Sequence, residues 1–344
     1  MSLVLGIESS CDETAVALVQ SDRTIRAQRI ASQDAQHAPY GGVVPEIAAR
    51  MHALRLAPMI ESVLAEANVS LEDCDAIAAT AGPGLIGGVM VGLVSAKALA
   101  MASDKPLLAI NHLEGHALSP RLADAALEFP YLLLLVSGGH CQILSIEGVG
   151  QYRRLATTID DALGEAYDKT AKILGLGFPG GPAVERSALE GDPNSVPLPR
   201  PLLKSKEPHF SFAGLKSAVL RAHDTGDYSN ADIAASFQKA AVECLIDRLQ
   251  MALGNSGSLP NLVVAGGVAA NMTIRTALET FAQNNGMGFS APPLQLCTDN
   301  AAMIAWAGCE RLELGQNDPL DFVARPRWPL DPTAEPARGA GVKA

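Results

Sequence analysis

The sequence predicts an α/β protein made of two duplicated lobes, and three observations favour this class. With 344 residues, the chain is too long for one small core. Its 48% hydrophobic and 18% charged residues exclude a disordered or low-complexity protein. One order of elements (strand, tight polar turn, two strands, then helices alternating with strands) occurs twice along it. We therefore expect two lobes of the same plan, with ligands bound in the cleft between them.

The first half opens with strands on either side of the polar turn Ser9–Glu13, and a third strand comes next. Pro45 begins a helix because its fixed φ suits a first helical turn, and Pro58 predicts a kink in that helix. Strands and helices then alternate. We expect strands at Leu3–Glu8, Thr14–Gln20, Thr24–Ser32, Ala76–Thr80 and Leu107–Asn111, and helices at Pro45–Ala67, Leu85–Ala102 and His112–Leu122.

The same order begins again at Tyr131, where the turn Ser137–His140 joins the first two strands of the second half. Longer helices dominate the remainder of this half. We expect strands at Tyr131–Val136, Cys141–Glu147, Tyr152–Thr157 and Leu262–Ala265, and helices at Asp161–Leu174, Pro182–Leu189, Ala213–Ala222, Asn230–Leu253, Ala270–Asn285 and Asp299–Leu314.

This pattern predicts the domain boundaries. Residues 1–125 should form an N-terminal lobe that the C-terminal helix, 299–325, joins, and residues 126–298 should form a C-terminal lobe. Residues 331–344 are rich in Pro, Ala and Gly and too poor in apolar side chains to pack, so we expect a flexible tail there.

The balance of charged residues bears on whether the protein binds nucleic acid by itself. Lys and Arg number 26 and Asp and Glu 37, so the net charge is −11. An acidic surface of this size repels polyanions, which argues against tight, unaided, non-specific binding to nucleic acid.

Several features indicate a soluble protein of the cytoplasm, without membrane contact. The six cysteines are dispersed with no C-x-x-C pair, as is typical of reduced thiols, and the N-terminus lacks the basic region of a signal peptide. The apolar run Leu85–Ala102 contains Lys97 and many glycines, which favours a buried helix over a membrane span.

The pair His112 and His116 is the sharpest chemical feature. On a helix, residues i and i+4 share a face, so both imidazoles can reach one metal ion. A carboxylate from elsewhere should complete the site, and Asp299 is a candidate, although a plain N-cap of the last helix would also explain it. Two histidines at this spacing also arise without a metal. A zinc peptidase is disfavoured because Glu114 lies about 200° around the helix from each histidine.

Glycine-rich turns offer places for phosphate. Ser137–Gly139 and the matching turn Ser9–Glu13 can present main-chain amides to an anion, and Gly266-Gly267 lies between a strand and a helix. Ordinary hairpin turns would favour the same residues, and the chain has no P-loop lysine motif. The acidic and basic residues of 159–172 have the simpler explanation of a solvated helix face.

These residues, in this order, resemble the tRNA N6-adenosine threonylcarbamoyltransferase family, formerly described as O-sialoglycoprotein endopeptidase. The resemblance extends from Gly6 to about Arg325, and many ordered motifs are more specific than any one of them. The matching segments are residues 6–14, 40–46, 112–116, 135–140, 168–172, 178–182, 210–216, 265–271 and 297–300.

The resemblance implies the actin/Hsp70/sugar-kinase (ribonuclease H-like) fold and one divalent metal ion per subunit, Fe²⁺ or else Zn²⁺. The metal ligands it implies are His112, His116 and Asp299. It gives Lys216 no defined role. The residues it implies for holding threonylcarbamoyl-AMP are Leu135, Val136, Ser137, Gly138, Gly139, Asp168, Gly181 and Asn271.

The activity implied is transfer of the threonylcarbamoyl group from threonylcarbamoyl-AMP to N6 of adenosine 37, in tRNAs that read codons beginning with A. The N6 amine is a poor nucleophile because its lone pair is delocalised, so the acyl group must be activated as a mixed anhydride. We expect Asp12 or Glu13 to accept the amine proton. A paralogous protein and an ATPase are the implied partners, and they would supply part of the basic surface for tRNA.

Two other functions remain open. An ATP-dependent kinase or ATPase of the same fold would share the phosphate turns but has no need of two metal-binding imidazoles. A non-catalytic scaffold would carry the motifs as relics, which the intact His112, His116 and Asp299 argue against.

Overall fold

The computed structural model describes residues 1–40, 42–256, 259–335 and 337. Contacts within the chain divide it into two units. Unit 1 comprises Met1–Ala126 and Thr298–Pro332, and unit 2 comprises Leu127–Cys297 with the residues from Thr333 onward. The C-terminal helix thus belongs to the unit that the N-terminus begins. Of the tail expected at 331–344, residues 336 and 338–344 lie outside the described residues.

Five strands form the sheet of unit 1, in the order β3-β2-β1-β4-β5. The first three strands form an antiparallel meander, and β4 and β5 continue the sheet parallel to β1. Every residue of β1, β4 and β5 is buried, which explains their unbroken apolar runs. The strands are β1 (Leu3–Glu8), β2 (Glu13–Gln20), β3 (Ile25–Ser32), β4 (Ala76–Gly82) and β5 (Leu107–Asn111).

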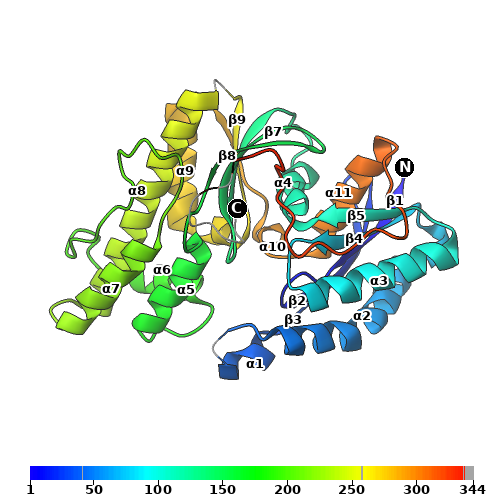
Figure 1. Ribbon diagram of the computed structural model, residues 1–344, viewed down its shortest axis with the longest axis horizontal. Coiled ribbons are helices and arrows are strands. Elements are labelled where there is room, and N and C mark those ends of the chain that lie inside the picture. Colours follow the sequence, from blue (N-terminus) through cyan, green and yellow to red (C-terminus); the bar gives the residue numbers. More distant parts are fainter. Residues whose placement is uncertain (41, 257–258, 336, 338–344) are drawn as a thin grey trace. The chain divides into compact units, whose positions relative to one another are not determined.

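Helices cover both faces of this sheet. In Figure 1, α11 (Ala301–Glu313) lies on one face, and α2 (Pro45–Ala67) and α3 (Ile86–Ser103) lie on the other. The apolar core of unit 1 lies between the sheet and α2 and α3. Close approach of α11 depends on Gly6 in β1, where an added Cβ would lie 2.5 Å from the Ala301 carbonyl oxygen.

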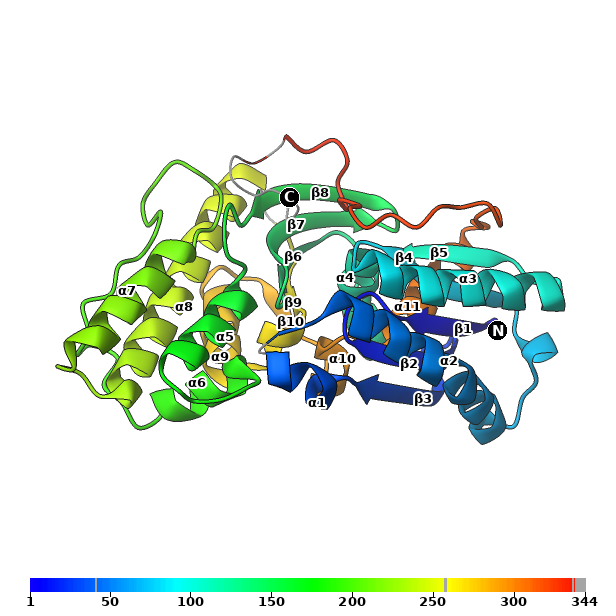
Figure 2. The same cartoon turned by 60° about the horizontal axis from the view of Figure 1, so that its bottom comes forward.

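The sheet of unit 2 repeats the plan of the first. Its order is β10-β9-β6-β7-β8, with an antiparallel meander of three strands and two further strands parallel to β6 (Figure 2). The two sheets therefore have the same topology, which confirms the predicted duplication. The strands are β6 (Tyr131–Val136), β7 (Cys141–Gly148), β8 (Gln151–Thr157), β9 (Asn261–Ala265) and β10 (Gly288–Ser290).

Helices of unit 2 pack on its sheet and on one another around the larger apolar core. The long α8 contacts β7 and β8, and α9 contacts β10. The helices are α5 (Leu163–Ile173), α6 (Gly180–Ala188), α7 (Ala213–Thr225), α8 (Asn230–Ser256) and α9 (Met272–Asn284).

The expected elements are present, with bounds that differ by a few residues. The last two long helices begin two residues later than predicted, because Asn271 and Asn300 accept N-cap hydrogen bonds from Ile274 N and Met303 N. Among the described α-helices and strands, three were not predicted because they are too short for periodicity to appear. They are α1 (Asp34–His37), α10 (Leu294–Cys297) and β10, the strand that completes the repeat.

One described helix, α3, is long and apolar enough to cross a membrane by length and composition, and 33% of that window is buried in the structure. Its buried residues face β4 and α2 and include Gly88 and Gly92. An added Cβ at Gly88 would lie 2.4 Å from the Ser9 carbonyl oxygen, so this helix rests directly on the β1–β2 turn.

A buried polar network ties the same turn to α2. The His52 Nε2 lies 3.0 Å from the Cys11 carbonyl oxygen, which can only accept, so Nε2 carries the proton. Nδ1 lies 2.8 Å from the Thr14 hydroxyl, which donates to it. Burial lowers the pKa of His52, and the Cys11 carbonyl and the nearby Glu8 carboxylate oppose this only in part.

The contact at Gly88 generates the first prediction. Gly88→Ala should lower the free energy of unfolding by about 1–3 kcal/mol, because the main-chain oxygen of Ser9 cannot move aside. Its neighbour provides the control: an added Cβ at Gly87 would lie 3.0 Å from the methyl carbon of Ala49, which can shift slightly. Urea denaturation should show a smaller loss for Gly87→Ala, and equal stability of Gly88→Ala and the parent would contradict the packing.

The environment of His52 generates a second prediction. Below pH 6.5 the unfolded chain takes up a proton that the folded protein resists, so stability should fall as the pH is lowered through 6.5. In ¹⁵N-histidine NMR spectra, His52 should be the Nε2–H tautomer at neutral pH and titrate below 6.5. A midpoint at or above 6.5 would contradict this.

Candidate metal centre

Three neighbouring parallel strands bring polar side chains to one edge of the first sheet. β1 ends in Glu8, β4 carries Thr80, and β5 ends in Asn111 directly before His112. The registers place Ile7 beside Ala79 and Thr80 beside Ile110, so these three strand ends are level. Ligand sites of α/β proteins collect at the carboxyl ends of parallel strands.

Helix α4 (His112–Ala123) carries both histidines one turn apart. The Asn111 side chain accepts a hydrogen bond from Leu113 N at 2.9 Å and so caps this helix at its first turn. The two rings lie edge to face with centroids 4.8 Å apart, and both are buried. The i, i+4 spacing thus puts both imidazoles on one buried face.

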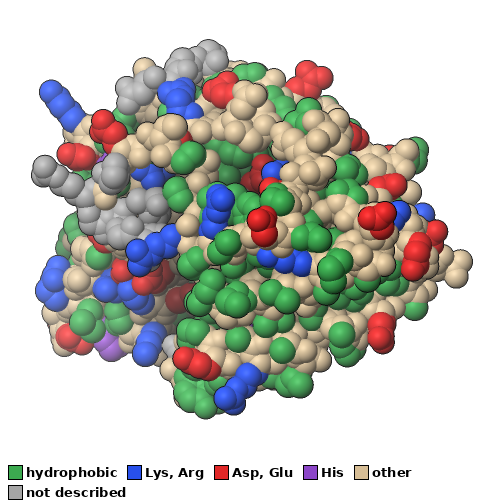
Figure 3. Space-filling view, turned by 45° about the vertical axis from the view of Figure 1, so that its right-hand side comes forward, with side chains coloured by type: hydrophobic (Ala, Val, Ile, Leu, Met, Phe, Trp, Pro, Cys, Tyr) green, Lys and Arg blue, Asp and Glu red, His purple; other side chains and the backbone are tan. Residues whose placement is uncertain are grey.

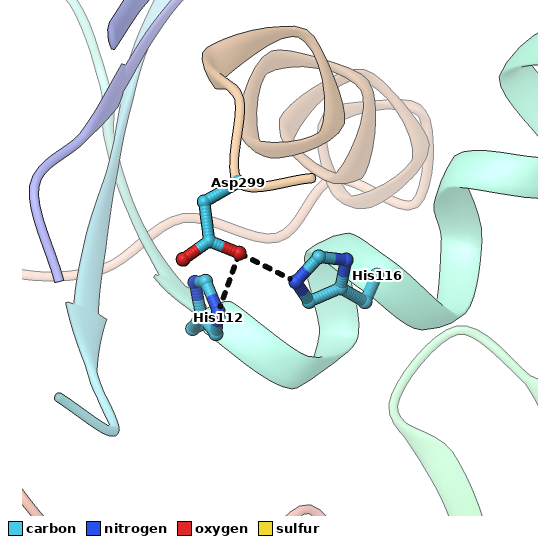
Figure 4. Close-up of side chains that lie close together, drawn as sticks. All are labelled: His112, His116 and Asp299. Carbon is cyan, nitrogen blue, oxygen red and sulfur yellow. Dashed lines mark hydrogen bonds and ion pairs between the residues drawn. The ribbon is translucent and has the colours of Figure 1, made fainter. Parts of the chain in front are cut away.

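Asp299 approaches both rings from the loop before α11. Its Oδ1 lies 3.0 Å from His116 Nε2 and 3.5 Å from His112 Nε2 (Figure 4). The N-cap of α11 is Asn300, so the Asp299 side chain is not needed to cap that helix. The structure therefore brings the three predicted metal ligands together, with their donor atoms within 4.8 Å of one another.

This donor set fits a divalent transition metal. Two imidazoles and one carboxylate, with room for further ligands, are typical of non-haem Fe²⁺ sites and of catalytic zinc. Burial opposes protonation of His112, but the carboxylates of Asp299 and Glu8 outweigh it and raise its pKa to about 9. The site therefore favours positive charge, which either a proton or a metal ion can supply.

The two proposed proton acceptors are Asp12, the last residue of the β1–β2 turn, and Glu13, the first residue of β2, and both are partly exposed. Burial raises the pKa of Glu13 to about 10, with further contributions from Asp299 and Asp12. Glu13 thus lies within the electrostatic reach of Asp299. A cation bound at Asp299 would offset that repulsion and favour the ionised form.

The predicted donor-binding residues lie in unit 2. In the turn after β6, the Ser137 N–H is committed to the His140 carbonyl at 2.8 Å, which leaves the exposed Gly138 and Gly139 to present amides to an anion. Leu135 and Val136 are fully buried within β6, and their role toward the donor stays a prediction.

The other three predicted residues lie at helix starts or on a helix. Asp168 of α5 accepts a hydrogen bond from Gly180 N at 2.8 Å, which fixes the loop before α6. An added Cβ at Gly181 would meet no described atom within 4 Å. Asn271 caps α9 and donates from Nδ2 to Gln238 at 2.9 Å, so much of its side chain is already used. Their role toward the donor stays a prediction.

Glu8 was missed as a site residue by sequence reasoning. It lies in a matching motif but has no role there, although a carboxylate at the end of the apolar run LVLGIE was an available signal. Asn300 was missed as the N-cap because Asp299 is an equally good capping residue by type.

Comparison with known proteins supports one family. A model of the tRNA N6-adenosine threonylcarbamoyltransferase family matches residues 24–306. Proteins of that name from Erythrobacter litoralis and Novosphingobium aromaticivorans are 78% and 71% identical to the chain, each over the whole of both sequences.

Among solved structures, component A of (R)-2-hydroxyglutaryl-CoA dehydratase from Acidaminococcus fermentans has a TM-score of 0.53 at 18% identity. The match covers 89% of this chain and 97% of that one, and it supports the two-lobe fold predicted from the sequence. By its family model and its full-length relatives, the chain belongs to the tRNA N6-adenosine threonylcarbamoyltransferase family.

Proposed function

We propose that the protein transfers the threonylcarbamoyl group from threonylcarbamoyl-AMP to N6 of adenosine 37, in tRNAs that read codons beginning with A. The observation that carries the proposal is the cluster of the buried His112 and His116 with the partly exposed Asp299, in a chain 78% identical over its full length to a protein of that name. A kinase of this fold would not need the two imidazoles.

Groups of the chain itself would stabilise the negative charge that develops on the donor and accept the proton of the amine. The amides of Gly138 and Gly139 would bind the phosphate or the carbamoyl oxygen as negative charge develops there. Asp12 or Glu13 would accept the proton that the N6 amine loses as its bond to the carbamoyl carbon forms and AMP leaves. Because Glu13 is held protonated in the metal-free protein, this role for it requires a cation nearby.

We propose one Fe²⁺ per subunit, with Zn²⁺ as the alternative, held by His112, His116 and Asp299. When bound, the metal would supply a Lewis acid that neutralises charge on the donor. The His112 imidazole must give up a proton to bind it: burial of the ring assists that loss, but the carboxylates of Asp299 and Glu8 oppose it and raise the pKa to about 9, so metal binding should weaken as the pH falls.

The docking face for the paralogous partner is proposed on α3. Four apolar side chains on it are exposed, so core packing does not explain them, and Figure 3 shows hydrophobic side chains gathered over this part of unit 1. Partners would also supply part of the basic surface for tRNA, since the net charge of −11 argues against tight binding to tRNA by this chain unaided. Such a complex belongs in the cytoplasm. The exposed side chains are Ile86 (46%), Met90 (50%), Val94 (56%) and Met101 (70%).

Metal content tests the ligand set. In His116→Ala, the bound metal should fall from about one ion per chain to near zero, because two donors hold a divalent ion poorly. The matched control is His223→Ala, which removes a partly exposed imidazole of unit 2. Elemental analysis of both variants decides, and full metal content in His116→Ala would refute the assignment.

Transfer of labelled threonine to tRNA, assayed with the partner proteins present, tests the activity. Asp12→Asn and Glu13→Gln keep the shape of each side chain and remove the base, so one of them should lower the rate about 10²–10⁴-fold with normal metal content. Near-normal rates in both variants would exclude Asp12 and Glu13 as the base. ATP hydrolysis without transfer by the unmodified protein would instead favour the kinase-like alternative.

A further inference from the structure

Glu8 is a fully buried carboxylate at the edge of the first sheet where the metal ligands lie. It is the last residue of β1 and the only charged one in that strand. A buried carboxylate is costly unless several donors satisfy it, so its partners indicate what it is for.

Three donors surround it. Oε1 accepts from Ser10 N at 2.6 Å, and Oε2 accepts from the Thr80 hydroxyl at 2.5 Å. The third partner is His112 Nδ1, 3.0 Å from Oε2. A carboxylate only accepts hydrogen bonds, so this contact requires the proton of His112 to be on Nδ1. The Ser10 hydroxyl, 3.2 Å from the same nitrogen, is compatible with that arrangement.

In the neutral ring that binds a metal, the other nitrogen of His112 carries the lone pair, and this nitrogen faces Asp299. Nε2 lies on the Asp299 side, 3.5 Å from Oδ1, as a metal ligand would require. His112 is also the first residue of α4, where no preceding helical turn restricts the ring. Its orientation must therefore come from outside the helix, and Glu8 provides it.

His116 is a natural comparison. It lies in the second turn of α4, and its Nδ1 is buried with no hydrogen-bond partner among the residues that the structure describes. Among the described residues, a carboxylate contacts the Nδ1 of His112 but not the Nδ1 of His116. The contact with Glu8 is therefore specific to His112 and not a general feature of this helix.

We propose that Glu8 is a positioning residue: it holds His112 as the Nδ1–H tautomer with Nε2 directed at the metal position beside Asp299. Carboxylates behind ligand imidazoles commonly fix their tautomer and raise their affinity for the metal. The inference rests on the metal-binding part of the proposed function.

Titration of the metal-free, full-length protein with Co²⁺ tests it. Glu8→Gln keeps the shape of the side chain, but its amide N–H₂ must face one of the three donors, which can no longer donate to it. His112 is then held less firmly, so cobalt should bind about 10–100-fold more weakly. The control is Glu310→Gln, a second buried glutamate of unit 1, which pairs with Arg121 at 2.7 Å and is not a predicted ligand. Its cobalt affinity should equal that of the unmodified protein.

The outcomes separate the two proposals. Suppose that Glu8→Gln folds and its melting temperature is no lower than that of Glu310→Gln. Unchanged cobalt affinity in this variant would then overturn the role of Glu8 and leave the metal centre standing. Unmodified protein that binds no cobalt would overturn the metal centre and this inference with it.

If Glu8→Gln does not fold, a crystal structure of the cobalt-loaded unmodified protein decides. Coordination through His112 Nε2 with Glu8 still bonded to Nδ1 supports the proposal. Coordination through Nδ1, or by Glu8 itself, overturns it.

Discussion

The approach of α11 to the first sheet is the contact on which the candidate site depends. Gly6 allows it, because any side chain there would collide with the Ala301 carbonyl. Since α11 begins only two residues after Asp299, its position against β1 determines where that carboxylate lies. The 3.0 Å contact with His116 therefore depends on a backbone packing contact between segments nearly 300 residues apart in sequence.

Asparagine caps recur where site residues meet helices. Asn111 caps α4 and directly precedes His112, Asn300 caps α11 and directly follows Asp299, and Asn271 caps α9. A cap fixes the backbone direction at the first turn, so a neighbouring side chain begins from a defined position. At α4 and α11 the structure thus separates two tasks between adjacent residues: the asparagine caps the helix, and its neighbour, His112 or Asp299, contributes to the candidate site.

Most of the fold follows from local pattern, whereas the site follows from it only in part. A continuous apolar run such as β6 and a helix as long as α8 are recognisable locally, but β10 has three residues and is recognisable only by its pairing with β9. The histidine pair is visible because both residues lie on one helix. Glu8 is not, because its contact with His112 depends on the register of β1, β4 and β5, which no local pattern encodes.

The split of unit 1 between the two ends of the sequence has a consequence for biosynthesis. On the ribosome, residues 127–297, which make up most of unit 2, are complete while unit 1 still lacks α11, so this part of unit 2 can fold first. The nascent first sheet meanwhile exposes the face that α11 will cover. Asp299 leaves the exit tunnel long after the two histidines, so the proposed metal centre can be complete only when translation is almost finished.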